Sequence, residues 1–127
     1  MRVIIAGSRG FKNYRQFLEF IKLIRFEVTS VVCGEAPGID LFGKRWAKER
    51  KIPYVSFPAD WDNLGRSAGY IRNQEMANNA DALFVLWDGK SPGTKHMVNI
   101  AKKKGLKIQM FIARPENSIP NNFNHIC

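Results

Sequence analysis

Short runs of β-branched and aliphatic residues alternate along this chain with longer amphipathic stretches, and this alternation limits the fold more than any other feature. The short runs predict strands at residues 2–6, 29–33, 54–57, 82–87 and 107–113. The longer stretches have apolar residues at three- and four-residue spacing, which predicts helices at 14–26, 39–50, 64–79 and 93–104. Strands that alternate with helices at this spacing form right-handed crossovers and a parallel sheet.

The second and fourth short runs are almost continuously apolar, which is typical of strands covered by helices on both faces. The sequence therefore predicts an α/β protein, a three-layer Rossmann-like sandwich. Its five-stranded, mainly parallel sheet is expected to have the order 3-2-1-4-5, with helices on both faces. We expect a single domain over residues 1–113. The tail at 114–127 is rich in Pro and Asn, and we expect it to be loosely ordered.

The charge of the chain narrows the choice of partners. Twenty Lys and Arg against eleven Asp and Glu give a formal net charge of +9, which attracts nucleotides, nucleic acid or acidic lipid. The apolar runs are too short to span a bilayer and the first residues do not resemble a signal peptide, so we expect a cytoplasmic protein without a membrane partner. His96 and His125 have no Cys or His at metal-ligand spacing. We therefore expect no metal site, and we expect no cofactor.

Ligands of such sheets bind beyond the carboxyl ends of the strands, so the loops that follow the strands are the first candidates. Segments 7–10, 34–40 and 88–94 are glycine-containing turns, and each leads into a predicted helix. Backbone amides and a helix N-terminus favour phosphate, although glycine also occurs in such turns for structural reasons alone. None of the segments is a complete dinucleotide or Walker motif. The candidate ligand residues here are Gly7, Ser8, Arg9, Gly34, Gly38, Asp40, Gly89, Ser91, Gly93 and Thr94.

The third predicted helix adds a second group of candidates. Gly65, Gly69 and Asn73 recur every four residues and form a small, partly polar stripe that is expected to admit a ligand or another subunit. Arg72 is on a neighbouring face, with Glu75 within reach at i+3. The alternative interpretation is a solvent-exposed face that carries an Arg–Glu surface pair.

Aromatic residues provide the third group of candidates. Trp61 stands between two carboxylates, and it is expected to stack on a base while Asp60 or Asp62 accepts hydrogen bonds from ribose hydroxyls. The alternative is a tryptophan that covers the edge of the core. Phe11, Tyr70 and the small-residue stripe are expected to form a two-fold contact, so the partner prediction includes a homodimer or higher homo-oligomer.

The chain also resembles the SLOG superfamily of Rossmann-like proteins, in particular its YspA/YpsA-related branch, over residues 1 to about 112. The resemblance implies a Rossmann-like fold and a ligand related to nucleotides. The superfamily includes the Lonely-guy phosphoribohydrolases, DNA-processing proteins that bind single strands, and sensor domains for nucleotide-derived signals. In chain order, the matching segments are Gly7-Ser8-Arg9, Cys33-Gly34-Glu35-Ala36-Pro37-Gly38-Ile39-Asp40, Phe57-Pro58-Ala59-Asp60-Trp61, Arg72-Asn73-Gln74-Glu75-Met76 with Ala80-Asp81, and Asp88-Gly89 to Gly93-Thr94.

The resemblance to the hydrolases is incomplete at the catalytic carboxylate. Arg72 matches their arginine, and Gly93-Thr94 match the end of their glycine-rich loop. Where their glutamate is expected, this chain has His96 and Met97. Methionine cannot stabilise an oxocarbenium-like centre or activate water, so Asp88 or Glu75 would have to supply the missing carboxylate. The candidate catalytic residues are therefore Arg72, Glu75 and Asp88.

Together these features favour a protein that binds a nucleotide or a nucleotide-derived signal, such as an ADP-ribose-like molecule. Its phosphate is expected on segments 7–9 and 89–94, with a contact from Arg72 and with Trp61 over the base or ribose. The first alternative is hydrolysis of the N-glycosidic bond of a nucleoside monophosphate. The second is binding of single-stranded nucleic acid, for which the net charge is the main argument.

Overall fold

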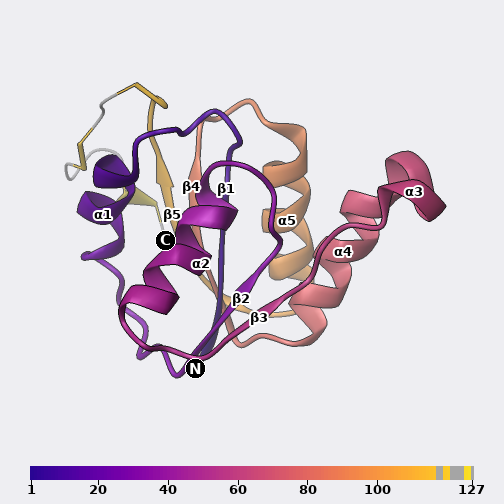
Figure 1. The fold of residues 1–127 in the computed structure, drawn as a ribbon, viewed down its shortest axis with the longest axis horizontal. Helices are drawn as coiled ribbons and strands as arrows, with labels where there is room; N and C mark the ends of the chain where they lie inside the picture. Colours follow the sequence, from indigo (N-terminus) through magenta and orange to yellow (C-terminus); the bar gives the residue numbers. More distant parts are fainter. Residues whose placement is uncertain (117–118, 121–124, 127) are drawn as a thin grey trace.

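A mainly parallel sheet forms the centre of the computed structural model, which describes residues 1–116, 119–120 and 125–126 (Figure 1). Within these residues the strand order is β3-β2-β1-β4-β5-β6. The five parallel strands thus have the predicted order 3-2-1-4-5, and the two-residue β6 pairs antiparallel with β5. The strands are β1 (Arg2–Gly7), β2 (Ser30–Cys33), β3 (Tyr54–Ser56), β4 (Ala82–Trp87), β5 (Lys107–Ile112) and β6 (His125–Ile126).

Helices cover both faces of the sheet and complete the predicted three layers (Figure 1). The short α3 is at the far end of α4, where it projects from the body of the molecule (Figure 1). No helix in the described part of the chain has the length and apolar character that a membrane span requires. The helices are α1 (Tyr14–Ile21), α2 (Ile39–Glu49), α3 (Trp61–Leu64), the 3-10 turn η1 (Gly65–Ser67), α4 (Ala68–Asn78) and α5 (Pro92–Lys103).

Alternate residues of the central strand contribute to two separate cores. Val3 and Ile5 pack in the cluster that contains the buried residues of α1 and α2, whereas Ile4 and Ala6 pack with those of α4 and α5. Successive side chains of a strand point to opposite faces, so a strand covered on both sides must be apolar at every position. This requirement explains the continuous apolar run in β1 and positions its carboxyl end between the two helical layers.

The first helix is shorter than predicted because a side chain from β5 forms hydrogen bonds with the backbone of the segment that follows it. The prediction extended to residue 26, but α1 ends at Ile21. The side chain of Gln109, which is almost fully buried, accepts a hydrogen bond from the Arg25 amide (2.9 Å) and donates one to the Leu23 carbonyl (2.9 Å). These bonds stabilise the non-helical course of the chain after α1.

The predicted helix over 64–79 is also wrong as a single element. Asp60 caps α3 through the Asn63 amide (3.3 Å), and Gly65 then adopts φ +55°, a left-handed conformation that ends α3. The regular α-helix begins only at Ala68. The expected stripe is therefore interrupted, because Gly65 does not share a helix with Gly69.

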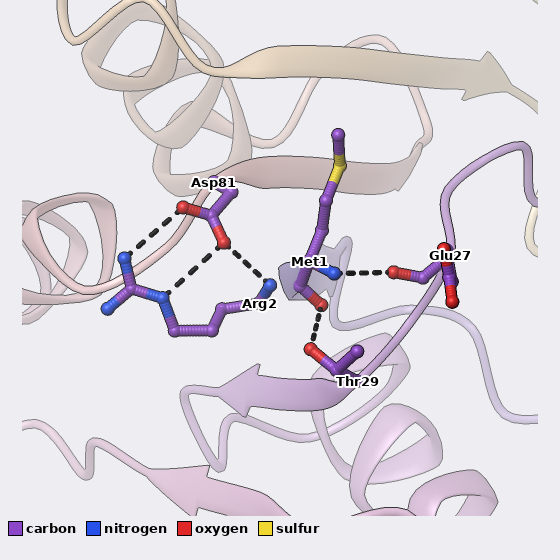
Figure 2. Close-up of polar contacts among 5 residues, drawn as sticks. All are labelled: Met1, Arg2, Glu27, Thr29 and Asp81. Carbon is purple, nitrogen blue, oxygen red and sulfur yellow. Dashed lines mark hydrogen bonds and ion pairs between the residues drawn. The ribbon is translucent and has the colours of Figure 1, made fainter.

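The amino ends of the strands are held together at the edge of the sheet opposite to the predicted ligand loops. Figure 2 shows Asp81 accepting from the amide of Arg2 (2.8 Å) and from its Nη2 (3.2 Å). In the same view the N-terminal amine donates to the Glu27 carbonyl (2.7 Å) and the Thr29 hydroxyl donates to the Met1 carbonyl (3.1 Å). Asp81, part of the segments that resemble the SLOG proteins, thus joins the start of β1 to the turn before β4.

The boundary at residue 113 and the loose order of 114–127 stay predictions. Residues 117–118, 121–124 and 127 lie outside the described residues. In the part that is described, Gln16 Nε2 donates to the Arg114 carbonyl (2.7 Å), and 125–126 form β6.

Candidate functional site

A cavity of about 360 Å³ is located where β1 ends and α2, α4 and α5 converge. Gly7 lines it from the end of β1, Arg9 from the loop that follows, and Asp40 from the first turn of α2. Ser91, Gly93 and Thr94 line it from the start of α5. The cavity thus occupies the carboxyl edge of the sheet, where the topology of an open α/β sheet places ligands.

The third side of the cavity comes from the segment after β3. Trp61, Arg72 and Asn73, all expected from the sequence, line it from α3 and α4. Arg66 and Tyr70 also line it, and neither was among the candidate ligand residues. Arg66 follows Gly65 in η1, so its position depends on the break in the predicted helix. The sequence signal that could have identified Arg66 is Gly65, if this glycine is interpreted as a helix breaker rather than as part of a helical stripe.

Arg72 is a buried cation whose donors are only partly used. Its Nη1 donates to the Gly34 carbonyl, and its Nε donates to Asn73 Oδ1 (3.2 Å). Within the described part of the chain, Nη2 has no hydrogen-bond partner. Burial lowers the pKa of Arg72, which the nearby carboxylate of Asp40 opposes. Arginine still carries its charge at neutral pH, so its remaining donors are available to an anion in the cavity.

Asp40 is the counter-charge of Arg72 and is itself buried, at 4% exposure in the first turn of α2. Burial raises the pKa of Asp40 to about 6, against the opposing effects of Arg72 and of the backbone amides of Ala36 and Gly7. Gly34 makes this arrangement possible: a Cβ there would lie 2.5 Å from Arg72 Nη1 and 2.7 Å from Asp40 Oδ2. A side chain at this position would displace the pair.

The start of α5 presents unpaired backbone amides to the cavity. Ser91 is the N-cap residue but makes no side-chain cap, and Pro92 follows it. In the described residues no hydrogen bond is formed by the amides of Gly93 and Thr94. The amides of Lys90 and Ser91 are not available, as both donate to Asp88 Oδ1 (2.8 Å each). A helix N-terminus with unpaired amides attracts anions.

Aromatic rings border the cavity beside these amides. Trp61 is 49% exposed and lies against Gly69, where a Cβ would be 3.2 Å from the indole. The guanidinium of Arg9 is 5.9 Å from the centre of that ring. Tyr70 is also half exposed and packs on His96 with ring centroids 4.3 Å apart. These rings offer flat apolar surface next to the amides and the arginines.

Asn73 connects α4 to α5 across the cavity. Its Nδ2 donates to the Gly93 carbonyl (3.2 Å) and is 3.1 Å from His96 Nδ1. Burial lowers the pKa of His96, so the ring is neutral at pH 7 and can accept from the amide. The amide of Asn73 thus holds the first turn of α5 and the His96 ring in place.

Some predicted ligand residues shape the loops without lining the cavity. The Ser8 hydroxyl is fully buried and accepts a hydrogen bond from the Asp88 amide (3.0 Å), which joins the loop after β1 to the loop after β4. Gly38, at φ +85°, brings the backbone of the loop after β2 against the backbone of Ser8 and Arg9. Gly34 lies under Arg72 as described, and Gly89 has φ +82° in the turn after β4.

The predicted carboxylates other than Asp40 also lie outside the lining of the cavity. Glu75 is on the exposed face of α4. Asp88 accepts from two backbone amides and from the Ser91 hydroxyl (2.9 Å), and these bonds lower the pKa of Asp88 although partial burial raises it. Asp60 caps α3. Across the described residues no group of three or more His, Cys, Asp or Glu side chains is arranged to hold a metal ion.

The expected two-fold contact loses one of its members. Phe11 is 1% exposed and belongs to the core on the α1 and α2 side, so it is not available for a contact between subunits. The prediction was wrong for Phe11 because the residue follows a glycine in an apparently polar loop, and only the tertiary structure folds that loop back over the core.

Comparison with known proteins identifies the family. Residues 1–63 match the model of YAcAr, the YspA, cpYpsA-related SLOG family. Gene 61 protein of Mycobacterium phage D29 is 34% identical over 123 residues, which cover 90% of this chain and 98% of that protein. The X-ray structure of DNA processing protein A (DprA) from Streptococcus pneumoniae shares the fold, with a TM-score of 0.64 and 16% identity over 91% of this chain; the chain spans 52% of the DprA chain. This chain belongs to the YspA, cpYpsA-related SLOG family.

Proposed function

We propose that this chain binds a nucleotide or a nucleotide-derived signal, such as an ADP-ribose-like molecule, in the cavity. One observation carries the proposal: the unpaired amides of Gly93 and Thr94 and the unused donors of Arg72 border the same cavity as exposed aromatic rings. Phosphate oxygens accept hydrogen bonds from helix N-termini and from guanidinium groups, and bases stack on flat aromatic surfaces. A nucleotide combines both kinds of group in one molecule.

The size and charge of the cavity support a small anionic ligand. Its volume of about 360 Å³ is within the range of roughly 300–1,000 Å³ that is usual for small-molecule sites. Arg9, Arg66 and Arg72 contribute positive charge, against the single carboxylate of Asp40 among the described lining residues. In this proposal the phosphate contacts the start of α5 and the arginines, and Trp61 covers the base or ribose.

Binding without hydrolysis is favoured over the phosphoribohydrolase alternative. Glu75 and Asp88, the carboxylates considered for catalysis, do not line the cavity. Asp88 already accepts hydrogen bonds from Lys90 and Ser91, which makes it a loop-forming residue. Chromatography for released base after incubation with nucleoside monophosphates tests this point. Release of base at a rate that depends on Glu75 or Asp88 would support the phosphoribohydrolase alternative instead.

Single-stranded DNA is the second candidate ligand, favoured by the net charge of +9 and by the likeness to a protein named for DNA processing. The two candidates differ in their dependence on salt. Binding to a strand engages many phosphates and weakens steeply as salt rises, whereas a small ligand releases few counterions. Competition by a mononucleotide against a labelled oligonucleotide, measured between about 50 and 200 mM salt, separates them.

Isothermal titration calorimetry with inorganic phosphate, AMP and ADP-ribose is the direct test. We expect Arg72→Ala to weaken binding by roughly ten- to 150-fold, as one charge-assisted hydrogen bond contributes about 1.5–3 kcal/mol. The variant leaves Asp40 buried without its counter-charge, so its folding is checked by circular dichroism. The exposed Arg66 provides a second variant, Arg66→Gln, for which weaker binding is expected in a folded protein.

The matched control is Arg15→Gln on α1, which changes the net charge equally but lies outside the cavity. It should bind AMP as the wild type does. Equal losses in Arg66→Gln and Arg15→Gln would indicate a general charge effect and contradict the proposed site.

A further inference from the structure

Asp40 is unusual in a cavity that otherwise suits anions. Among the described residues that line it, Asp40 is the one carboxylate, and it is almost fully buried. It lies in the first turn of α2, next to the guanidinium of Arg72. An ionised carboxylate repels phosphate at short range. The part of the ligand that reaches Asp40 is therefore a different chemical group from the phosphate.

The protonation state of Asp40 specifies what that group must offer. Burial raises the pKa of Asp40, but only to about 6, so the carboxylate is mainly ionised at neutral pH. Ionised carboxylates only accept hydrogen bonds. In a nucleotide the donors are the ribose hydroxyls and the N–H groups of the base. The exposed rings of Trp61 and Tyr70 suit the base, whereas Asp40 lines the cavity and is almost fully buried, which leaves the ribose for Asp40.

Building on the proposed function, we propose that Asp40 is the specificity-determining residue of the site and that its carboxylate accepts hydrogen bonds from the ribose hydroxyls of the ligand. The sequence had suggested Asp60 or Asp62 for this task. The carboxylate of Asp60 instead accepts from the Asn63 amide (3.3 Å) and from Asn63 Nδ2 (3.0 and 3.2 Å), which ties it to α3. Asp40 thus makes the site selective for ribonucleotides over deoxyribonucleotides.

The test compares AMP with 2′-deoxy-AMP and 3′-deoxy-AMP by isothermal titration calorimetry on the full chain. A lost hydrogen bond to a charged acceptor corresponds to a fall in affinity of at least about tenfold for one or both deoxy ligands. In Asp40→Asn the acceptor is neutral, and the preference for AMP should shrink to about threefold. Glu35→Gln is the control, since Glu35 is in the same loop but pairs with Lys44 outside the cavity.

The outcomes separate this inference from the proposed function. A preference for AMP in the wild type and in Glu35→Gln, reduced in Asp40→Asn, supports it. Equal binding of all three ligands by the wild type overturns it and leaves nucleotide binding intact. A preference that survives unchanged in Asp40→Asn overturns it too, because the hydroxyls are then recognised elsewhere. Failure of all three ligands to bind overturns the proposed function and this inference with it.

Discussion

Replacing Asp40 with Asn should remove a pH-dependent cost from the folding of this protein. The pKa of Asp40 is about 6 in the folded chain, against an ordinary value of 3.8. Between these pH values the folded state binds more protons than the unfolded state, so the free energy of unfolding falls as pH rises. A pKa raised from 3.8 to about 6 corresponds to about 3 kcal/mol. The loss begins near pH 4, as pH passes the ordinary pKa, and is complete by about pH 7, above the raised pKa.

Urea denaturation at pH 4, 5, 6 and 7 measures this effect for the wild type and for Asp40→Asn. The free energy of unfolding of the wild type, minus that of the variant, should fall by about 2–3 kcal/mol across this range. Glu35→Gln provides a control of opposite sign. The hydrogen bond from Lys44 lowers the pKa of Glu35, so that residue adds stability at neutral pH that is lost as pH falls below 4.5, its ordinary value. A difference between wild type and Asp40→Asn that stays constant with pH would refute the desolvation argument.

Three further substitutions test the packing and the loops by chemical denaturation. Gly43→Ala should lower the free energy of unfolding by about 1–3 kcal/mol, because its Cβ would lie 2.6 Å from Ile5 Cγ2 in the core. Ser8→Ala should cost about 1–3 kcal/mol, since it leaves the Asp88 amide without its acceptor. Asn13→Ala should cost about 1 kcal/mol, as Asn13 Oδ1 caps α1 by accepting from the amides at residues 15 (3.0 Å) and 16 (3.3 Å).

Each of these substitutions has a matched control. Gly93→Ala adds a methyl group where no atom lies within 4 Å, so its stability should stay close to that of the wild type. Ser67→Ala removes a hydroxyl that bonds at an exposed position, where water replaces the lost partner. Asn13→Ser keeps a capping oxygen and should recover most of the loss. Equal effects for a substitution and its control would contradict the contact assigned to that residue.

The five parallel strands were predicted to within one residue at each end because their apolar runs are strong local signals, whereas the two-residue β6 was not predicted. The run at 82–87, for example, matches β4 in full. The helices predicted at 14–26 and 64–79 were predicted less well, whereas α2 and α5 were predicted to within one residue at each end. Gln109 lies far along the chain from Leu23 and Arg25, yet its hydrogen bonds hold the segment that follows α1. No periodicity within residues 14–26 contains that information.

The candidate site was also predicted only in part from the sequence. The sequence by itself indicated the glycine loops, Arg72 and Trp61, because glycine turns before helices and a parallel sheet together specify one edge of the molecule. Only the tertiary structure decided which polar groups remain available there. Asp88 accepts hydrogen bonds from the amides of Lys90 and Ser91, and Asp40 is the buried carboxylate that lines the cavity. The physical reason is that hydrogen-bond partners and desolvation depend on which atoms meet in space, and residue spacing does not fix that.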